Sequence, residues 1–433
     1  MDTILIKALQ LILSLSILVV VHEFGHFLFA KLFRVRVEKF YLFFNPWFSL
    51  FKFKPKKSDT EYGIGWLPLG GYVKISGMID ESMDKEALKQ PPQPWEFRIK
   101  PAGQRLLIMI GGVLMNFVLA FFIYSLVVFK WGDNYIPIDK TPLFFSEVAQ
   151  QAGFQDGDII LAADGKALQR YDDLDLFKII DAKQVTVFRE DRKETIAIPG
   201  DFKSRFLATR TIFADFSPAR IDSLLPEGNG EKAGLKVGDK IVSVDGKSIN
   251  SLGRLSLQLE NHKNASVELG VVRDQETLTI TTDVDAGGKI GFTTSRPALV
   301  HEKYNFFKSI PAGISFCMRK LSFYVLQLKL LFTKEGLGSI GGFGAIGSLF
   351  PATWNWNTFW SMTAFLSIML GVMNLLPIPA LDGGHVMFLL YEVVTGRQPN
   401  EKLMEYAQIT GMFLLFAILI YANGMDIIRA FFS

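Results

Sequence analysis

The sequence predicts a membrane protein of mixed α+β class, in which four transmembrane helices carry an inserted pair of similar β-rich domains. Three observations predict this class: long apolar segments, a large charged fraction between them, and an internal repeat. Hydrophobic residues make up 49% of the 433 residues and charged residues 21%. Such a chain is too apolar for an ordinary soluble protein and too charged to lie in a bilayer throughout.

The apolar segments predict the membrane helices, because a helix needs about 20 mostly apolar residues to cross a bilayer. We expect four such helices, at residues 1–34, 104–130, 358–392 and 403–431. The first segment is too long, and too polar in its second half, for a cleavable signal sequence. We therefore expect it to be retained as a membrane anchor.

Basic residues predict the orientation, because short cytoplasmic loops are enriched in lysine and arginine. The 35–103 loop contains a basic cluster, formed by Lys52, Lys54, Lys56 and Lys57. This places the loop on the cytoplasmic side and both termini on the opposite side. The 299–357 region is hydrophobic but carries several basic residues and Pro311, so we expect an amphipathic helix at the membrane interface.

An internal repeat predicts the inserted domains. The segment AGFQDGDIILAADGKAL (152–168) recurs 81 residues later as AGLKVGDKIVSVDGKSI (233–249). Each copy predicts a turn at Gly-Asp, a strand, and an Asp-Gly hairpin turn before the next strand. We therefore expect two tandem β-rich domains, at 131–208 and 209–298.

Composition excludes some classes of partner and one kind of covalent link. The net charge is only +3, and no stretch combines dense basic residues with aromatic ones, so nucleic acid is not an expected partner. Cys317 is the only cysteine, and the chain therefore has no intrachain disulfide.

The strongest candidate site lies in the first apolar segment, in VVVHEFGHFLFA (19–30). On a helix, His22 and His26 share one face and can direct both imidazoles at one metal ion. Glu23 is close enough to reach a water at that metal. Imidazole ligands favour Zn²⁺, which makes water acidic enough for a glutamate to take its proton. Ionisable residues inside a membrane helix are functional by default, so we predict a zinc site.

A third ligand must lie at the same membrane depth, and NLLPIPALDGGH (374–385) offers two candidates. Asp382 is the preferred ligand because a carboxylate completes a two-histidine, one-carboxylate set, and His385 is the alternative. Pro377 and Pro379 should break the helix here. Broken backbone at membrane depth is tolerated only where it is buried in protein or lines a cavity.

These motifs together resemble a known family. HEFGH in the first span, NLLPIPALDGG in the third, and tandem repeats similar to bacterial protease PDZ domains are found together in the site-2 protease family of intramembrane zinc metalloproteases. The resemblance implies that His22, His26 and Asp382 bind zinc and that Glu23 is catalytic.

The same resemblance implies how substrate binds. Asn374, the first residue of the third-span motif, would hold substrate backbone. The stretch EYGIGWLPLGGYVKI (61–75) resembles a membrane-reentrant β-hairpin of the family, whose edge strand would pair with extended substrate. This puts Gly70, Gly71 and Tyr72 among the expected substrate-binding residues.

The implied activity is regulated intramembrane proteolysis in the bacterial inner membrane, within a stress response. Substrates would be single-pass membrane proteins: an anti-sigma factor already trimmed by another protease, and remnant signal peptides. The PDZ pair would lie in the periplasm and the active site toward the cytoplasmic side. Neither repeat contains the usual Gly-Leu-Gly-Phe loop, which leaves open whether the PDZ grooves bind peptide or only exclude bulky substrates.

The chain departs from the family pattern at two places, and two other functions compete. Relatives carry Gly-Pro where this chain has Gly112-Val113, ahead of Asn116, and Gly-Pro-Ile near Gly342–Ile346. Neither change touches the expected ligands. A zinc transporter would need polar residues staggered through the other spans, which are not found. A membrane-anchored PDZ scaffold without proteolysis would leave the complete HEFGH and LDG motifs without a role.

Overall fold

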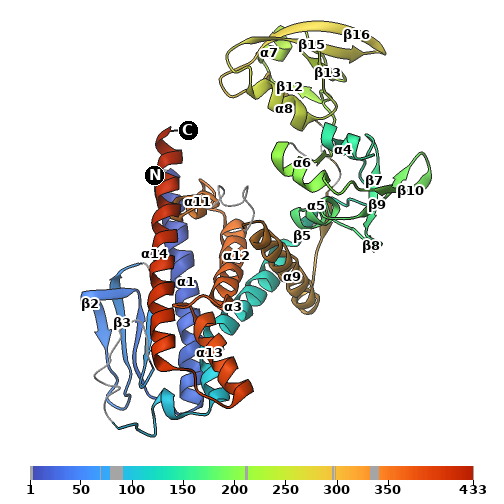
Figure 1. The fold of residues 1–433 in the computed structure, drawn as a ribbon. Coiled ribbons are helices and arrows are strands. Elements are labelled where there is room, and N and C mark those ends of the chain that lie inside the picture. Colours follow the sequence, from blue (N-terminus) through green and yellow to red (C-terminus); the bar gives the residue numbers. More distant parts are fainter. Residues whose placement is uncertain are drawn as a thin grey trace. The chain divides into compact units, whose positions relative to one another are not determined.

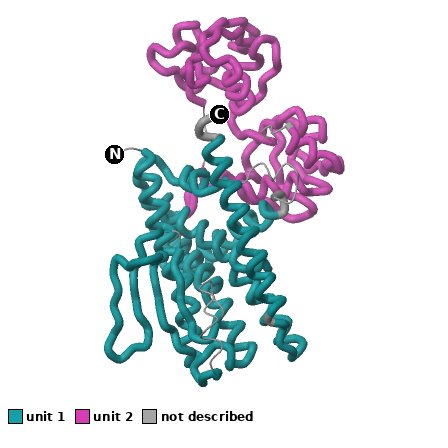
Figure 2. The backbone as a smooth tube through the Cα atoms, turned by 60° about the vertical axis from the view of Figure 1, so that its left-hand side comes forward, with its two compact units in different colours: residues 1–132, 303–433 teal, residues 133–302 magenta. Residues whose placement is uncertain are grey.

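The computed structural model describes residues 3–68, 70–78, 91–209, 213–294, 297, 299–331 and 341–432. The chain divides into two compact units, which Figure 2 colours separately. Unit 1 combines residues 1–132 with 303–433, so two distant parts of the chain build one body. Unit 2 comprises residues 133–302, the region between the second and third apolar segments.

Within the described residues, unit 1 contains four long apolar helices (Figure 1). They are α1 (Thr3–Leu32), α3 (Ala102–Trp131), α12 (Trp356–Leu375) and α14 (Glu401–Phe432). Each is long and apolar enough to cross a bilayer, which confirms the membrane-helical part of the expected fold. Both chain termini lie at the same end of this bundle, as an even number of crossings requires (Figure 1).

Helix α3 lies at the centre of unit 1, where it contacts α1, α12, α13 (Asp382–Thr395) and α9 (Phe306–Leu331). Glycines allow its close approach to α1. A Cβ atom at Gly25 would lie 2.2 Å from the carbonyl oxygen of Gly111, so a larger residue there would push the helices apart. Small residues commonly permit such close contact between membrane helices.

The third apolar segment, expected over 358–392, is interrupted. Helix α12 ends at Leu375 and α13 begins at Asp382, with non-helical backbone between them. Pro377 and Pro379 lie in this break, because proline cannot donate a helical hydrogen bond and clashes with the preceding turn. The break puts Asp382 in the first turn of a helix, next to the cavity described below.

The 35–103 loop contains a four-stranded sheet, with β1 (Val37–Leu42), β2 (Phe44–Phe53), β3 (Glu61–Leu67) and β4 (Tyr72–Ile75). The strand order is β2-β3-β1-β4. The expectation of a hairpin at 61–75 was wrong: β3 pairs with β1 in parallel and with β2, while β4 pairs antiparallel with β1. Strand β1 lies between the two strands that were expected to pair. Within the described residues β4 is an edge strand.

Helix α9 occupies much of the region expected to be amphipathic. Its buried residues Cys317 and Tyr324 pack with Tyr124 of α3 and Ile368 of α12. Large apolar side chains such as Phe307 remain exposed on other parts of the helix. The described part of unit 1 also contains two short helices, η1 (Phe97–Ile99) and α11 (Phe343–Ser348).

Unit 2 contains two copies of one arrangement. The first comprises β6 (Phe144–Phe145), α4 (Glu147–Gln151), β7 (Ile159–Ala163), β8 (Lys166–Ala167), α5 (Asp173–Ile180), β9 (Gln184–Arg189), β10 (Arg192–Ala197), α6 (Phe202–Thr209) and β11 (Ala214–Asp215). The second comprises β12 (Ser223–Leu224), α7 (Asn229–Lys232), β13 (Lys240–Val244), β14 (Lys247–Ser248), α8 (Leu252–Glu260), β15 (Ser266–Arg273), β16 (Glu276–Asp283) and β17 (Phe292–Thr293). The main sheets have matching orders, β10-β9-β7-β8 and β16-β15-β13-β14.

The predicted Asp-Gly hairpin turns are confirmed in both copies. Asp164 and Gly165 have φ of 48° and 74°, and Asp245 and Gly246 have φ of 47° and 77°. These turns join β7 to β8 and β13 to β14. Positive φ at both central residues is the geometry that an Asp-Gly pair favours in a two-residue hairpin.

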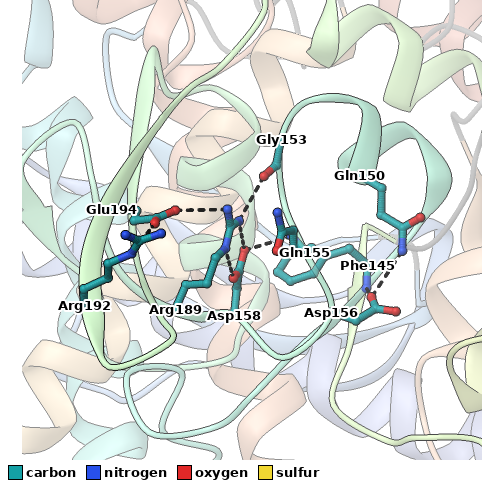
Figure 3. Close-up of polar contacts among 9 residues, drawn as sticks. All are labelled: Phe145, Gln150, Gly153, Gln155, Asp156, Asp158, Arg189, Arg192 and Glu194. Carbon is teal, nitrogen blue, oxygen red and sulfur yellow. Dashed lines mark hydrogen bonds and ion pairs between the residues drawn. The ribbon is translucent and has the colours of Figure 1, made fainter.

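Each repeat also contains the same buried ion pair. The aspartate of the first Gly-Asp turn, Asp158, accepts two hydrogen bonds from Arg189, which also bonds the carbonyl of Gly153 (Figure 3). In the second repeat, Asp239 accepts two bonds of 2.7 Å from Arg273. Burial disfavours the ionised form of Asp239, but the hydrogen bonds from Arg273 outweigh this and hold the pKa of Asp239 below its usual range.

The first and last strands of unit 2 pair with each other. Strand β5 (Asp133–Tyr135) runs antiparallel to β18 (Val300–Glu302), and Asp133 faces Glu302 in this ladder. The hydroxyl of Tyr135 donates to Glu302. The two points where the chain enters and leaves unit 2 are therefore neighbours.

Candidate metal centre

Helix α1 presents the two histidines of the HEFGH motif on one buried face. The residues are one helical turn apart, and each is only 7% exposed. Their Nε2 atoms lie 3.3 Å apart, with the rings nearly perpendicular. Two imidazoles can therefore reach one point beside the helix, as the four-residue spacing predicts.

Asp382 comes to the same point from the first turn of α13. Its Oδ2 atom lies 3.1 Å from Nε2 of His22 and 3.3 Å from Nε2 of His26. The break between α12 and α13 makes this approach possible. The structure thus brings together the three residues that sequence analysis selected as ligands, although Asp382 lies more than 350 residues after the two histidines in the chain.

The chemistry of these three groups fits a metal ion. One ligand atom from each residue lies within 4.8 Å of the other two. The Asp382 Oδ2 atom is buried and has no hydrogen-bond partner. A buried carboxylate oxygen without a donor is unfavourable, and a cation between the three groups would satisfy it. Two imidazoles and a carboxylate are the ligand types that Zn²⁺ takes.

The orientation of His26 also suits metal binding. Its Nδ1 atom lies 2.9 Å from the backbone carbonyl oxygen of Ile108 in α3. A carbonyl oxygen only accepts, so Nδ1 carries the hydrogen and the Nε2 lone pair faces His22 and Asp382. Metal-binding histidines generally use their second nitrogen in this way.

Glu23 lines the same cavity, which has a volume of about 660 Å³. The cavity is bounded by α1, by β4 with the residues before it, and by the break between α12 and α13. Val73 in β4 lines this cavity together with Glu23, and a Cβ atom at Gly71, just before β4, would lie 3.6 Å from Cγ of Glu23. The edge strand of the sheet therefore lies directly beside the candidate base.

The four residues expected to bind substrate also line this cavity: Asn374, Gly70, Gly71 and Tyr72. The amide nitrogen of Asn374 lies 3.4 Å from Nε2 of His22. The Tyr72 hydroxyl donates to Asn45, and the Tyr72 ring stacks on Tyr41. Burial raises the pKa of Tyr72 to about 12, so its phenol stays neutral at physiological pH.

His385, the alternative ligand, stays outside the three-residue cluster. It lies on the cavity wall, with its Nε2 atom 2.9 Å from the side-chain nitrogen of Gln408. Sequence reasoning did not find Gln408, or the contact between Asn116 of α3 and His22. An amide residue within an apolar helix was the available signal for both, since buried polar groups need partners.

The class of the protein follows from comparison with known sequences. The chain matches peptidase family M50 over residues 10–418 and therefore belongs to this family of site-2 proteases. It is a zinc metalloprotease of the site-2 type.

Relatives of known name match over nearly the whole chain. A Vibrio cholerae protein assigned as a zinc metalloprotease is 30% identical, covering 99% of this chain and 100% of the relative. The regulator of sigma-E protease RseP of Escherichia coli is 28% identical, covering 96% and 97%. The regulator of sigma E protease of Haemophilus influenzae is 28% identical, covering 96% and 98%. The similarity is thus not confined to short motifs.

Proposed function

We propose that this protease hydrolyses peptide bonds within the transmembrane segments of single-pass membrane proteins. The observation that carries the proposal is the convergence of His22, His26 and Asp382 beside Glu23, in a cavity among apolar helices. Few functions other than metal-dependent catalysis explain two buried histidines and two half-buried carboxylates together among apolar helices.

In this proposal His22, His26 and Asp382 hold the zinc ion. Bound there, zinc supplies Lewis acidity, which polarises a carbonyl oxygen and lowers the pKa of water. The protein fixes the ligand geometry through two helices and through the hydrogen bond from His26 to Ile108. His385 is then not a ligand but part of the cavity wall.

Glu23 acts as the general base and then as the general acid. It takes a proton from the attacking water and returns it to the amine that leaves when the peptide bond breaks. The single carboxylate therefore serves both proton transfers. Its place in the cavity next to the ligand residues supports this role.

A helical substrate must unwind before it can be cut, because its carbonyls are hydrogen-bonded within the helix. The outer edge of β4, which no other described strand pairs with, offers backbone groups to an extended substrate beside Glu23. Gly70, Gly71 and Tyr72 would contact the substrate at this edge, and Asn374 would bind an exposed backbone group on the opposite side.

We further propose the cellular setting. The substrates are an anti-sigma factor, after its ectodomain has been trimmed, and remnant signal peptides, as the names of the sigma-E protease relatives and the family resemblance suggest. The protein lies in the bacterial inner membrane, with its active site toward the cytoplasm. The two repeats are periplasmic PDZ domains that exclude bulky ectodomains.

The substitution Glu23→Gln tests this function in purified, detergent-solubilised protein. We expect the variant to bind as much zinc as the wild type and to lose roughly 10²- to 10⁴-fold in cleavage of a single-pass substrate with a truncated ectodomain. Asp382→Ala is the matched control and should lose zinc and cleavage together. Cleavage by Glu23→Gln at the wild-type rate would refute the proposed mechanism.

A further inference from the structure

A side-chain amide of α3 contacts one of the proposed zinc ligands. Asn116 is fully buried, and its Nδ2 atom lies 3.0 Å from Nδ1 of His22. Its Oδ1 atom is also buried and has no hydrogen-bond partner. No step of the proposed reaction uses this residue, so the contact needs another explanation.

The chemistry of imidazole restricts what Asn116 can do. If His22 binds a metal through Nε2, its Nδ1 atom carries the hydrogen and must find an acceptor. For His26 that acceptor is the carbonyl of Ile108. In the structure, the amide nitrogen of Asn116 faces Nδ1 of His22. An amide nitrogen donates and cannot accept, so this orientation leaves the Nδ1–H of a metal-binding His22 without an acceptor.

A half-turn of the amide group resolves this conflict. The oxygen and nitrogen of an asparagine amide have nearly the same shape, and their assignment depends on the hydrogen-bond network. The half-turn puts Oδ1 of Asn116 against Nδ1 of His22. In either orientation one atom of the amide lacks a hydrogen-bond partner, so burial does not determine which orientation is correct. If His22 is a ligand, only the orientation with Oδ1 against its Nδ1–H is favourable.

We propose that Asn116 is a positioning residue whose carbonyl oxygen accepts the Nδ1–H of His22 and so directs Nε2 at the zinc ion. The inference rests on the proposed function, because it requires His22 to be a ligand. The backbone at this position is itself held, since the Ser367 hydroxyl of α12 donates to the Asn116 carbonyl oxygen at 2.8 Å. This bond ties the Asn116 backbone to α12, while the side-chain Oδ1 remains available to His22.

Zinc affinity in the purified full-length protein tests the inference, measured by competition with a chromophoric chelator. Asn116→Asp keeps an acceptor and removes the donor, while Asn116→Leu removes both at similar size. We expect Asn116→Asp to bind zinc within a factor of about three of the wild type, and Asn116→Leu to bind about 10- to 100-fold more weakly. Ser125→Ala, which removes a buried hydroxyl of the same helix that contacts neither Asn116 nor His22, should bind like the wild type.

Each outcome decides the question. Equal weakening in Asn116→Asp and Asn116→Leu would mean that the amide donates to His22, and would overturn the inference. Wild-type affinity in Asn116→Leu would also overturn it. If Asn116→Leu does not fold, the Asn116→Asp result alone still separates acceptor from donor. Failure of the wild-type protein itself to bind zinc would instead refute the proposed function.

Discussion

At the scale of a single residue, substitution of Asn374 tests whether a side chain in the cavity acts on the substrate or on the metal ligands. Its amide faces the cavity and reaches His22 only at 3.4 Å, a long contact. We expect Asn374→Leu to raise KM for a single-pass substrate roughly tenfold, because an exposed substrate backbone group would lose its partner. Bound zinc should be unchanged, and both quantities are measured on the same preparation. A loss of zinc would show that Asn374 supports His22 instead.

The histidines of the candidate metal centre could be predicted from sequence because their signal is local. Two histidines four residues apart, inside an apolar helix, have few structural explanations. The choice of Asp382 over His385 required a chemical argument about the ligand set. Asn116 could not be predicted as a contact of His22, since only the crossing of α1 and α3 puts an amide at its Nδ1 atom.

At the scale of the element, the edge strand β4 predicts a backbone requirement. Val73 lies in this strand beside Glu23, and its N–H is a candidate donor to substrate at the edge away from β1. We expect Val73→Pro to weaken capture of a single-pass substrate at least several-fold, since proline removes this donor but is tolerated on an edge strand. The measurement is photocrosslinking in the Glu23→Gln background.

Val73→Ala provides the control for this experiment, because it shortens the side chain and preserves the backbone donor. It should capture substrate as well as the parent protein does. If both variants lose capture, the side chain of Val73 matters rather than the strand edge. Unchanged capture by Val73→Pro would remove β4 from the proposed binding site.

The ion pair of the second repeat predicts a pH dependence. The pKa of Asp239 is lower in the folded state than its ordinary value near 4, so its ionised form stabilises the repeat. This contribution is complete above about pH 4 and is lost as pH falls through the lower folded value. The protection factors of β13 and β15, which correct for the pH dependence of intrinsic amide exchange, should therefore fall in acid.

Arg273→Met is the comparison for this pH series. Without the guanidinium, β13 and β15 should exchange faster already at neutral pH and change less on acidification. Strands β7 and β9 serve as the internal control, because they contain the equivalent pair of Asp158 and Arg189 unchanged. Identical exchange profiles in both proteins would contradict the assigned role of the pair.

The elements themselves were unequally predictable. The length of the apolar segments was enough to predict the four described membrane helices, and the Asp-Gly pairs were enough to predict two hairpin turns. The sheet of unit 1 was not predictable in the same way. Two strands close in sequence, as at 61–75, normally pair with each other, but here β1 inserts between them. Pairing between distant segments depends on tertiary context that local patterns do not contain.

At the scale of the whole molecule, the pairing of β5 with β18 predicts that unit 2 can be removed. Asp133 and Glu302 face each other, so their Cα atoms are about 5 Å apart, and a short glycine-serine linker can replace residues 133–302. We expect the shortened protein to retain zinc and to cleave substrates with intact and truncated ectodomains at similar rates. The wild type should cleave only the truncated one.

The outcome with the intact ectodomain decides the role of the repeats. Continued rejection of that substrate by the shortened protein would mean that unit 1 itself discriminates, and the proposed size filter would be wrong. Loss of zinc would mean that unit 2 stabilises the membrane unit. Zinc content is therefore measured before either substrate is compared.

The burial of Cys317 has a practical consequence for studying the intact molecule. This thiol is the only one in the chain, it is inaccessible, and its surroundings raise its pKa to about 12. Because little of this thiol is ionised and the side chain is buried, the unmodified protein should not react with a maleimide. It can therefore serve as the background for cysteine labelling. Single cysteines introduced at exposed Lys57 or Lys247 would then report sidedness directly: a membrane-impermeant maleimide added to intact spheroplasts should label the second and spare the first.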